Sequence, residues 1–170
     1  NKKKSQLNLL KAKFKRGDIS KMDYRDCMYD FHKILFDYSE FIKDTDIKKI
    51  EIIDNNVIMT SREHGIKIAC MKGDVRIAPI ETLSSDYYEK NDTRMLYNLI
   101  ENNSTVFDIG ANIGWYSIGL STHKKNTNVY SFEPIPKVFE NLKLNLKLNK
   151  STQIKLFNYG FYNKKKTLTF

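Results

Sequence analysis

The sequence is 170 residues long, about the size of one domain, and 41% of its residues are hydrophobic and 29% are charged. With only 7 Gly and 3 Pro, this composition excludes a collagen-like or fully disordered chain. The apolar runs are too short to span a bilayer, and 2 cysteines are too few for a disulfide framework. We therefore expect a packed domain in the cytoplasm, with Cys27 and Cys70 as buried thiols in a reducing compartment.

The charge is basic, with 29 Lys and Arg against 20 Asp and Glu and a net charge of +9. Basic chains bind nucleic acid, acidic membranes or anionic ligands. Here the charge is spread thinly, and lysine dominates without an arginine-rich stripe interleaved with aromatic residues. This pattern favours a solubilising surface, so we do not expect nucleic acid as a partner.

The N-terminal part of the chain is predicted to be helical. Residues 5–16 predict a short basic helix that stops near Gly17, and Ser20 with Asp23 fits a capping pattern for the next helix. Apolar side chains then recur at steps of three and four, which places them on one helix face. We expect this face to pack on its own domain. Its members are Tyr24, Met28, Phe31, Leu35, Tyr38 and Ile42.

The apolar period changes to two over residues 49–78. This alternation predicts a small antiparallel meander, with turns near Asn55 and near His64, which would then be solvated. Asp74 and Arg76 follow as candidates for an ion pair or a substrate contact.

After the meander, Ser84 or Ser85 is expected to cap a helix that turns Leu96, Leu99 and Ile100 inward. From residue 104 the pattern becomes strand, helix, strand, helix, strand, with strands expected at 105–109, 128–132 and 154–159. Strands that alternate with helices predict an α/β fold with a parallel sheet and right-handed crossovers.

Residues 106–117, Val-Phe-Asp-Ile-Gly-Ala-Asn-Ile-Gly-Trp-Tyr-Ser, combine an apolar strand, an acid, a glycine turn and a helix start. In open α/β sheets, ligands bind at the carboxyl ends of strands. Gly110 and Gly114 lack a β-carbon, so the backbone can turn sharply and a ligand can lie against it. The spacing is Gly-x-x-x-Gly, which differs from the dinucleotide fingerprint Gly-x-Gly-x-x-Gly.

Charge favours one ligand class for this turn. A pyrophosphate would gain from the helix N-terminus but lose from the carboxylate of Asp108, whereas S-adenosylmethionine (SAM) brings an ammonium and a sulfonium. Glu133 ends the second strand, where a carboxylate can accept both ribose hydroxyls for roughly 1.5–3 kcal/mol each. Because nicotinamide enzymes use an acid here too, an NAD-dependent oxidoreductase stays open as an alternative. A basic, non-enzymatic nucleic-acid-binding module is the other alternative.

Three segments together resemble the FkbM family of SAM-dependent methyltransferases. They are residues 106–117, Val-Tyr-Ser-Phe-Glu-Pro-Ile-Pro at 129–136 and Asn-Leu-Lys-Leu-Asn at 141–145, and the likeness extends over residues 86–170. The resemblance implies a Rossmann-like class I methyltransferase fold with SAM as cofactor. It also implies O-methylation of a hydroxyl on a sugar, glycan or polyketide-like small molecule.

The resemblance also implies which residues bind the cofactor, while the general base stays unidentified. The methionine end would be lined by Asp108, Gly110, Ala111, Asn112 and Gly114. Tyr88 and Glu89 are candidates for a contact with that end, with a plain helix-cap role as the alternative. Glu133 would hold the ribose, and Tyr159, Gly160 and Phe161 would lie near the adenine. Of Trp115 and Tyr116, we expect one in the core and the other at the wall of the cleft. Three scattered histidines make no metal site.

We expect residues 1–83 to form an N-terminal helical and β-meander segment, as a cap or on the substrate side. Residues 84–170 would form the N-terminal half of the SAM-binding domain. The family's sheet has seven strands, and this chain reaches the third strand plus the start of a hairpin at 167–170. Because the central strand would lack a neighbour, we expect residues 1–170 alone to be inactive.

Overall fold

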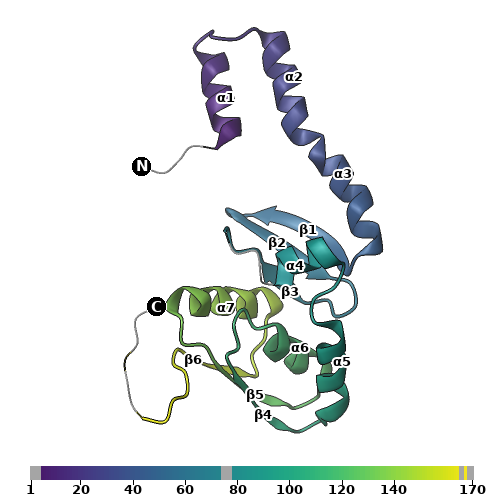
Figure 1. Cartoon of the computed structure of the whole chain (residues 1–170), viewed down its shortest axis with the longest axis vertical. Coiled ribbons are helices and arrows are strands. Elements are labelled where there is room, and N and C mark those ends of the chain that lie inside the picture. The colour runs from purple at the N-terminus through teal and green to yellow at the C-terminus, as the bar shows by residue number, and fades with distance from the viewer. Residues whose placement is uncertain (1–4, 74–77, 165–166, 168–170) are drawn as a thin grey trace. The chain divides into compact units, whose positions relative to one another are not determined.

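A computed structural model describes residues 5–73, 78–164 and 167 (Figure 1). The chain divides into two compact units, Asn1–Lys43 and Asp44–Phe170. Asp74, Arg76 and residues 168–170 of the last expected strand lie outside the described residues. Within the described ranges, no helix combines the length and apolar character needed to cross a membrane.

The first unit consists of α1 (Gln6–Lys15), α2 (Lys21–His32) and α3 (Ile34–Phe41), and a short 3-10 turn, Ile42–Asp44, follows. Ser20 caps α2 as predicted, because its hydroxyl accepts the Asp23 amide at 3.1 Å and donates to the Asp23 carboxylate at 2.7 Å. Phe14 of α1 stacks on Tyr24 of α2 with ring centroids 4.4 Å apart. The predicted basic helix and the cap of the next helix are therefore confirmed.

The apolar face of α2 and α3 is more open than the sequence suggested. Tyr24 and Met28 are half-buried, but Phe31, Leu35 and Tyr38 are 44%, 58% and 39% exposed. No residue of α1, α2 or α3 is buried. Within the first unit, α1 covers only one end of this face, so the packing predicted for the rest of it is not found among the described residues of that unit.

The two thiols also differ from the expected buried pair. Cys27 of α2 is exposed, so that part of the prediction is wrong. Cys70 is half-buried, and burial raises the pKa of its thiol to about 11. Cys70 is therefore protonated and unreactive at neutral pH.

The second unit begins with the predicted meander. Strands β1 (Ile47–Ile53), β2 (Asn56–Ser61) and β3 (Lys67–Ala69) form an antiparallel sheet in that order. Asp54 and Asn55 take the positive φ values of 48° and 65° that a tight hairpin turn needs, so the turn near Asn55 is confirmed.

Two helices, α4 (Ala78–Ser85) and α5 (Lys90–Leu99), connect the meander to the parallel sheet. The capping prediction is wrong here, because Ser84 and Ser85 lie at the end of α4 and Glu89 occupies the N-cap position of α5. Leu99 was expected inward but is 70% exposed. Thr93 takes an inward position instead and accepts a hydrogen bond from Trp115 Nε1 at 3.0 Å.

The parallel sheet has the predicted strand and helix order. Strands β4 (Thr105–Ile109), β5 (Asn128–Phe132) and β6 (Ile154–Phe157) lie side by side in chain order. Helices α6 (Trp115–His123) and α7 (Pro136–Asn149) form the crossovers and lie on the same side of the strands (Figure 1). This arrangement confirms the Rossmann-like methyltransferase fold expected from the sequence.

The two faces of the parallel sheet differ in chemistry. Val129 and Ser131 are fully buried on the face that carries α6. The opposite face is aromatic: the rings of Phe107 and Tyr130 stack at 5.2 Å, and those of Phe132 and Phe157 stack at 4.8 Å. Phe107 is 59% exposed, so this face is open among the described residues.

Two asparagines of α7 join the meander to the parallel sheet. The fully buried Asn145 accepts the Ala69 amide of β3 at 2.9 Å and donates to the Ile113 carbonyl of the glycine turn at 2.8 Å. Asn149 accepts the Lys67 amide at 2.8 Å and donates to the Lys67 carbonyl at 2.7 Å. These side-chain amides satisfy backbone groups of the edge strand that would otherwise be unpaired.

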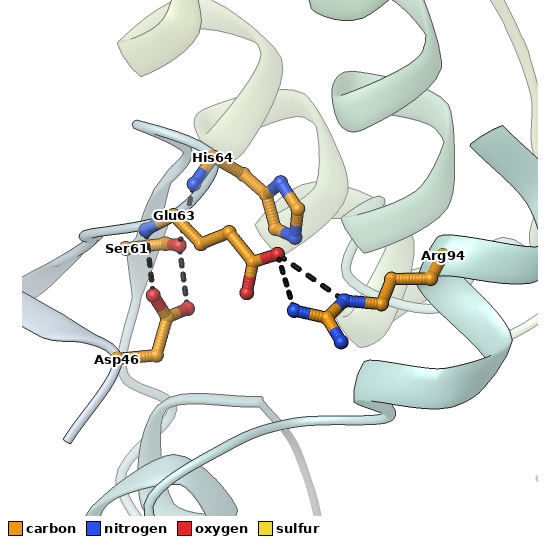
Figure 2. A network of polar contacts seen from close by, with 5 residues as sticks. All are labelled: Asp46, Ser61, Glu63, His64 and Arg94. Carbon is orange, nitrogen blue, oxygen red and sulfur yellow. Dashed lines mark hydrogen bonds and ion pairs between the residues drawn. The ribbon is translucent and has the colours of Figure 1, made fainter.

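A polar network joins the meander to α5 (Figure 2). The buried Asp46 accepts the Ser61 hydroxyl at 2.6 Å and the Glu63 amide at 2.7 Å, and Glu63 pairs with Arg94 of α5 at 3.3 Å. His64 is half-buried against Trp115, with ring centroids 6.2 Å apart, and burial lowers the pKa of its imidazole. The prediction of a solvated His64 is therefore wrong, because the turn folds its ring against α6.

We expect Asn145→Leu to lower the free energy of unfolding by about 2–5 kcal/mol, because it leaves the Ala69 amide and the Ile113 carbonyl unpaired. Asn141, one turn earlier on α7, is the matched control, because its side-chain nitrogen is buried without a hydrogen-bond partner. Asn141→Leu should not lower stability, because it removes no hydrogen bond of that nitrogen and relieves its unpaired burial. Urea unfolding measures both variants, and equal effects would contradict the role of Asn145.

Candidate functional site

The turn between β4 and α6 is held by the end of β5. The amides of Gly110 and Ala111 both donate to the Phe132 carbonyl, each at 2.9 Å. Gly110 and Gly114 have φ values of +83° and +89°, which side-chain-bearing residues rarely adopt. The strand, glycine turn and helix predicted from residues 106–117 are therefore present, at the carboxyl edge of the sheet.

The Glu133 side chain fixes the next part of this turn. Its carboxylate is 5% exposed and accepts two amides, from Asn112 at 3.0 Å and from Ile135 at 2.8 Å. A carboxylate oxygen has two acceptor positions, so each oxygen keeps one for a ligand. Asn158 donates to the Glu133 carbonyl at 2.8 Å and brings the end of β6 to the same place. The ribose-binding role of Glu133 stays a prediction that this geometry supports.

Asp108 lies on the covered face of β4. Its carboxylate accepts the Ser117 hydroxyl at 2.5 Å, and the Ser117 oxygen lies 2.6 Å from that of Ser131. Burial raises the pKa of Asp108, and the Glu133 carboxylate adds to the rise. Burial therefore disfavours the charged form of Asp108, and a nearby cation would favour it.

Glu89, at the start of α5, contacts the first turn of α6 that follows the glycine turn. The Tyr116 hydroxyl in the first turn of α6 donates to the Glu89 carboxylate at 2.5 Å. Trp115 is 4% exposed and contacts the Tyr88 ring edge-on, with centroids 5.3 Å apart. Trp115 is thus the core residue of the adjacent pair, and Tyr116 points toward the predicted site residue Glu89.

The three residues expected near the adenine gather around the end of β5. The rings of Tyr159 and Phe161 lie 5.6 Å and 4.8 Å from the ring of Phe132. Gly160 lies close to the Pro134 ring. A β-carbon added at Gly160 would come within 3.3 Å of that ring, so the position has little room for a side chain. Tyr159 and Phe161 are 53% and 59% exposed, so they offer apolar surface beside Glu133.

The electrostatics of the site favour a cationic ligand. Glu89, Asp108 and Glu133 surround the turn, and none of them pairs with a lysine or arginine in the part of the chain that the structure describes. This is unusual in a chain whose net charge is +9. A ligand with an ammonium and a sulfonium is attracted by three carboxylates that lack a basic partner, whereas the negative charge of a pyrophosphate is repelled by them. The space beside Gly110 is open, since a β-carbon there would meet no atom within 4 Å.

Sequence reasoning missed several residues that shape the site. Ser117 and Ser131 hold Asp108, Tyr116 holds Glu89, and Asn145 holds the turn at Ile113. Ser131 alternates with apolar residues on its strand, so the periodicity could have placed it on the covered face. The hydrogen bonds of Asn145 could not be predicted from the sequence, because they depend on how α7 packs against other elements.

Comparison with known proteins identifies the family. The model of the TRM5/TYW2 methyltransferase domain matches residues 61–158, more than half of the chain, from the end of β2 to the residue after β6. The chain belongs to this family. Membership makes SAM the cofactor and confirms the prediction of a SAM-dependent methyltransferase.

The relatives of the chain include proteins that modify tRNA. A tRNA (guanine(37)-N(1))-methyltransferase of Plasmodium knowlesi is 25% identical over 152 residues, which cover 84% of this chain and 21% of that protein. The chain therefore spans about a fifth of the length of the curated relative that it matches.

Two solved structures with a similar fold are reported with a ligand. One is M. jannaschii TYW2 in complex with AdoMet, at 21% identity and a TM-score of 0.48 over 59% of this chain and 42% of that one. The other is the complex of aTrm5 and tRNALeu, at 23% identity and a TM-score of 0.44 over 61% of this chain and 28% of that one.

These findings correct three predictions. The resemblance to the FkbM family is wrong, because the family model is that of TRM5/TYW2. O-methylation of a sugar, glycan or polyketide loses its basis with that resemblance. The nicotinamide alternative fails because the matched family is one of methyltransferases. The prediction that nucleic acid is not a partner is also contradicted, since the P. knowlesi relative is a tRNA (guanine(37)-N(1))-methyltransferase. The glycine turn and its acids were interpreted as a cofactor site, and this interpretation carried no information on the acceptor.

The two glycines of the turn should respond differently to a β-carbon. Gly110→Ala places a methyl group in open space, so we expect weaker SAM binding, by about tenfold, with a stability loss of only about 1–2 kcal/mol from the positive φ. Gly114→Ala would bring its β-carbon against Leu142 of α7, so we expect mainly lost stability. Thermal unfolding and calorimetric titration separate the two effects. Normal SAM affinity in Gly110→Ala would show that the ligand lies elsewhere.

Proposed function

We propose that this chain is the cofactor-binding part of a tRNA methyltransferase that transfers the methyl group of SAM to a guanine ring nitrogen. The observation that carries the proposal is the match of the TRM5/TYW2 methyltransferase domain to residues 61–158, which contain the glycine turn and Glu133. The P. knowlesi relative, a tRNA (guanine(37)-N(1))-methyltransferase, supports the choice of guanine N1. The net charge of +9 suits a polyanionic substrate.

In this proposal, three groups of residues contact three parts of SAM: the ribose, the methionine moiety and the adenine. Glu133 accepts the ribose hydroxyls with the acceptor positions that its two backbone amides leave free. Asp108 and Glu89 face the methionine end, with Gly110, Ala111, Asn112 and Gly114 along the turn and Tyr88 beside Glu89. Tyr159, Gly160 and Phe161 offer the apolar surface for the adenine.

The chemistry needs orientation and an acceptor for one proton, because guanine N1 carries a hydrogen at neutral pH. N1 attacks the methyl carbon of SAM in line with the sulfur–carbon bond, the sulfur keeps the bonding electrons and leaves as S-adenosylhomocysteine, and the N1 proton passes to a base or to water. Holding the reactants in that geometry contributes roughly 7–11 kcal/mol to lowering the barrier. The turn, fixed by the Phe132 carbonyl and by Glu133, is a rigid platform for this positioning.

The test uses the full-length protein that contains this chain, unmodified tRNA transcripts and SAM labelled in its methyl group. We expect label in tRNA, recovered as N1-methylguanosine after digestion to nucleosides. Label in ribose, or none in tRNA despite SAM binding, would contradict the proposal.

Glu133→Gln is the matched variant, because the amide keeps the size of the side chain but loses the charge and one acceptor. We expect SAM affinity to fall about tenfold or more, since a hydrogen bond to a charged group is worth roughly 1.5–3 kcal/mol. Affinity within twofold of wild type would contradict the ribose assignment.

Three further expectations stay predictions. They are the cytoplasmic location, the division of the chain at residues 83 and 84, and the inactivity of residues 1–170 alone.

A further inference from the structure

The contact between Tyr116 and Glu89 is not explained by the packing of the fold. Glu89 is exposed and takes a left-handed conformation with φ of 41°, so its place at the start of α5 is backbone-strained. Its carboxylate makes no capping hydrogen bond to α5. It is bonded instead to the hydroxyl of Tyr116, which belongs to another helix.

The surroundings of Tyr116 keep its hydroxyl a donor. Burial raises the pKa of Tyr116, and the hydrogen bond to Glu89 raises it further, so the phenol stays protonated at physiological pH. The nearest lysine in sequence does not neutralise Glu89, because the Lys90 ammonium lies 3.6 Å over the Tyr87 ring. Glu89 therefore has neutral phenol partners, Tyr116 and the adjacent Tyr88, and its carboxylate keeps acceptor capacity for a ligand.

The position of this charge relative to the turn selects its ligand. Tyr116 lies two residues after Gly114, so its hydrogen bond fixes Glu89 beside the helix start that follows the turn. Glu133 lies across the turn, at the end of β5. The two carboxylates thus hold different parts of the loop, Glu133 the turn at Asn112 and Glu89 the helix start at Tyr116. A ligand that lies along the turn with its ribose at Glu133 would bring its other end toward Glu89.

We propose that Tyr116 is a positioning residue that holds the Glu89 carboxylate to accept the ammonium group of the SAM methionine moiety. This inference rests on the proposed function, because it assumes that SAM binds along the turn with its ribose at Glu133. It assigns Tyr116 a role that its place in the first turn of α6 does not require, since the adjacent Trp115 fills the core.

The test compares two ligands in calorimetric titrations of the full-length protein. S-adenosylhomocysteine carries the aminocarboxypropyl group, and 5′-methylthioadenosine lacks it, while both share the adenosine. We expect Tyr116→Phe, which keeps the ring, to weaken S-adenosylhomocysteine about fivefold or more and to change methylthioadenosine less than twofold. Glu133→Gln should weaken both ligands by the same factor.

Coupling between the two residues distinguishes positioning from packing. Glu89→Gln should weaken S-adenosylhomocysteine by about tenfold, and adding Tyr116→Phe should weaken it little further, because the hydroxyl acts through the carboxylate. Tyr87→Phe is the control, since it removes a hydroxyl from the same segment and should leave both affinities unchanged.

The outcomes separate the two proposals. If wild type binds neither ligand, the proposed function fails and takes this inference with it. If wild type prefers S-adenosylhomocysteine but Tyr116→Phe keeps that preference, or if both ligands weaken equally in Tyr116→Phe, the positioning role is overturned while the SAM site stands.

Discussion

The site depends on how the end of β5 holds the turn that follows β4. One carbonyl, that of Phe132, accepts the amides of Gly110 and Ala111, and the next residue, Glu133, accepts the amide of Asn112 with its side chain. Three consecutive amides of a loop are thus satisfied from a neighbouring strand, so the turn needs no ligand to keep its shape. A rigid, ligand-free turn loses little conformational freedom on binding, which favours affinity.

The second constraint is the anchoring of this turn to the rest of the unit. Helix α7 lies between the parallel sheet and β3, and the Asn145 side chain bonds to both the edge strand and the Ile113 carbonyl of the turn. Gly114 lets the turn approach α7 closely, because any β-carbon would meet Leu142. The meander therefore supports the site indirectly, through one fully buried asparagine.

Much of this architecture could be predicted from the sequence, because it depends on local patterns. Alternating apolar residues gave the meander, and residues 106–117 gave the strand, the glycine turn and the helix. In the helix ending at Leu99, Leu96 and Ile100 are half-buried, but Leu99 is exposed. Thr93 is buried instead, because it accepts a hydrogen bond from Trp115 of another element. His64 and Asn145 depend on contacts between distant segments in the same way. The methyl acceptor could not be predicted, because residues 106–117 and Glu133 were interpreted only as contacts to the cofactor.

The central claim is that the turn held by Glu133 is where the cofactor binds. Hydrogen–deuterium exchange of the full-length protein, with and without saturating S-adenosylhomocysteine, measures this directly, because a bound ligand slows exchange where it stabilises the backbone. The account predicts slower exchange in peptides that span residues 108–117 and 130–136, with little change in the β1–β2 hairpin. Protection confined to other segments, with exchange at the turn unchanged, would contradict it.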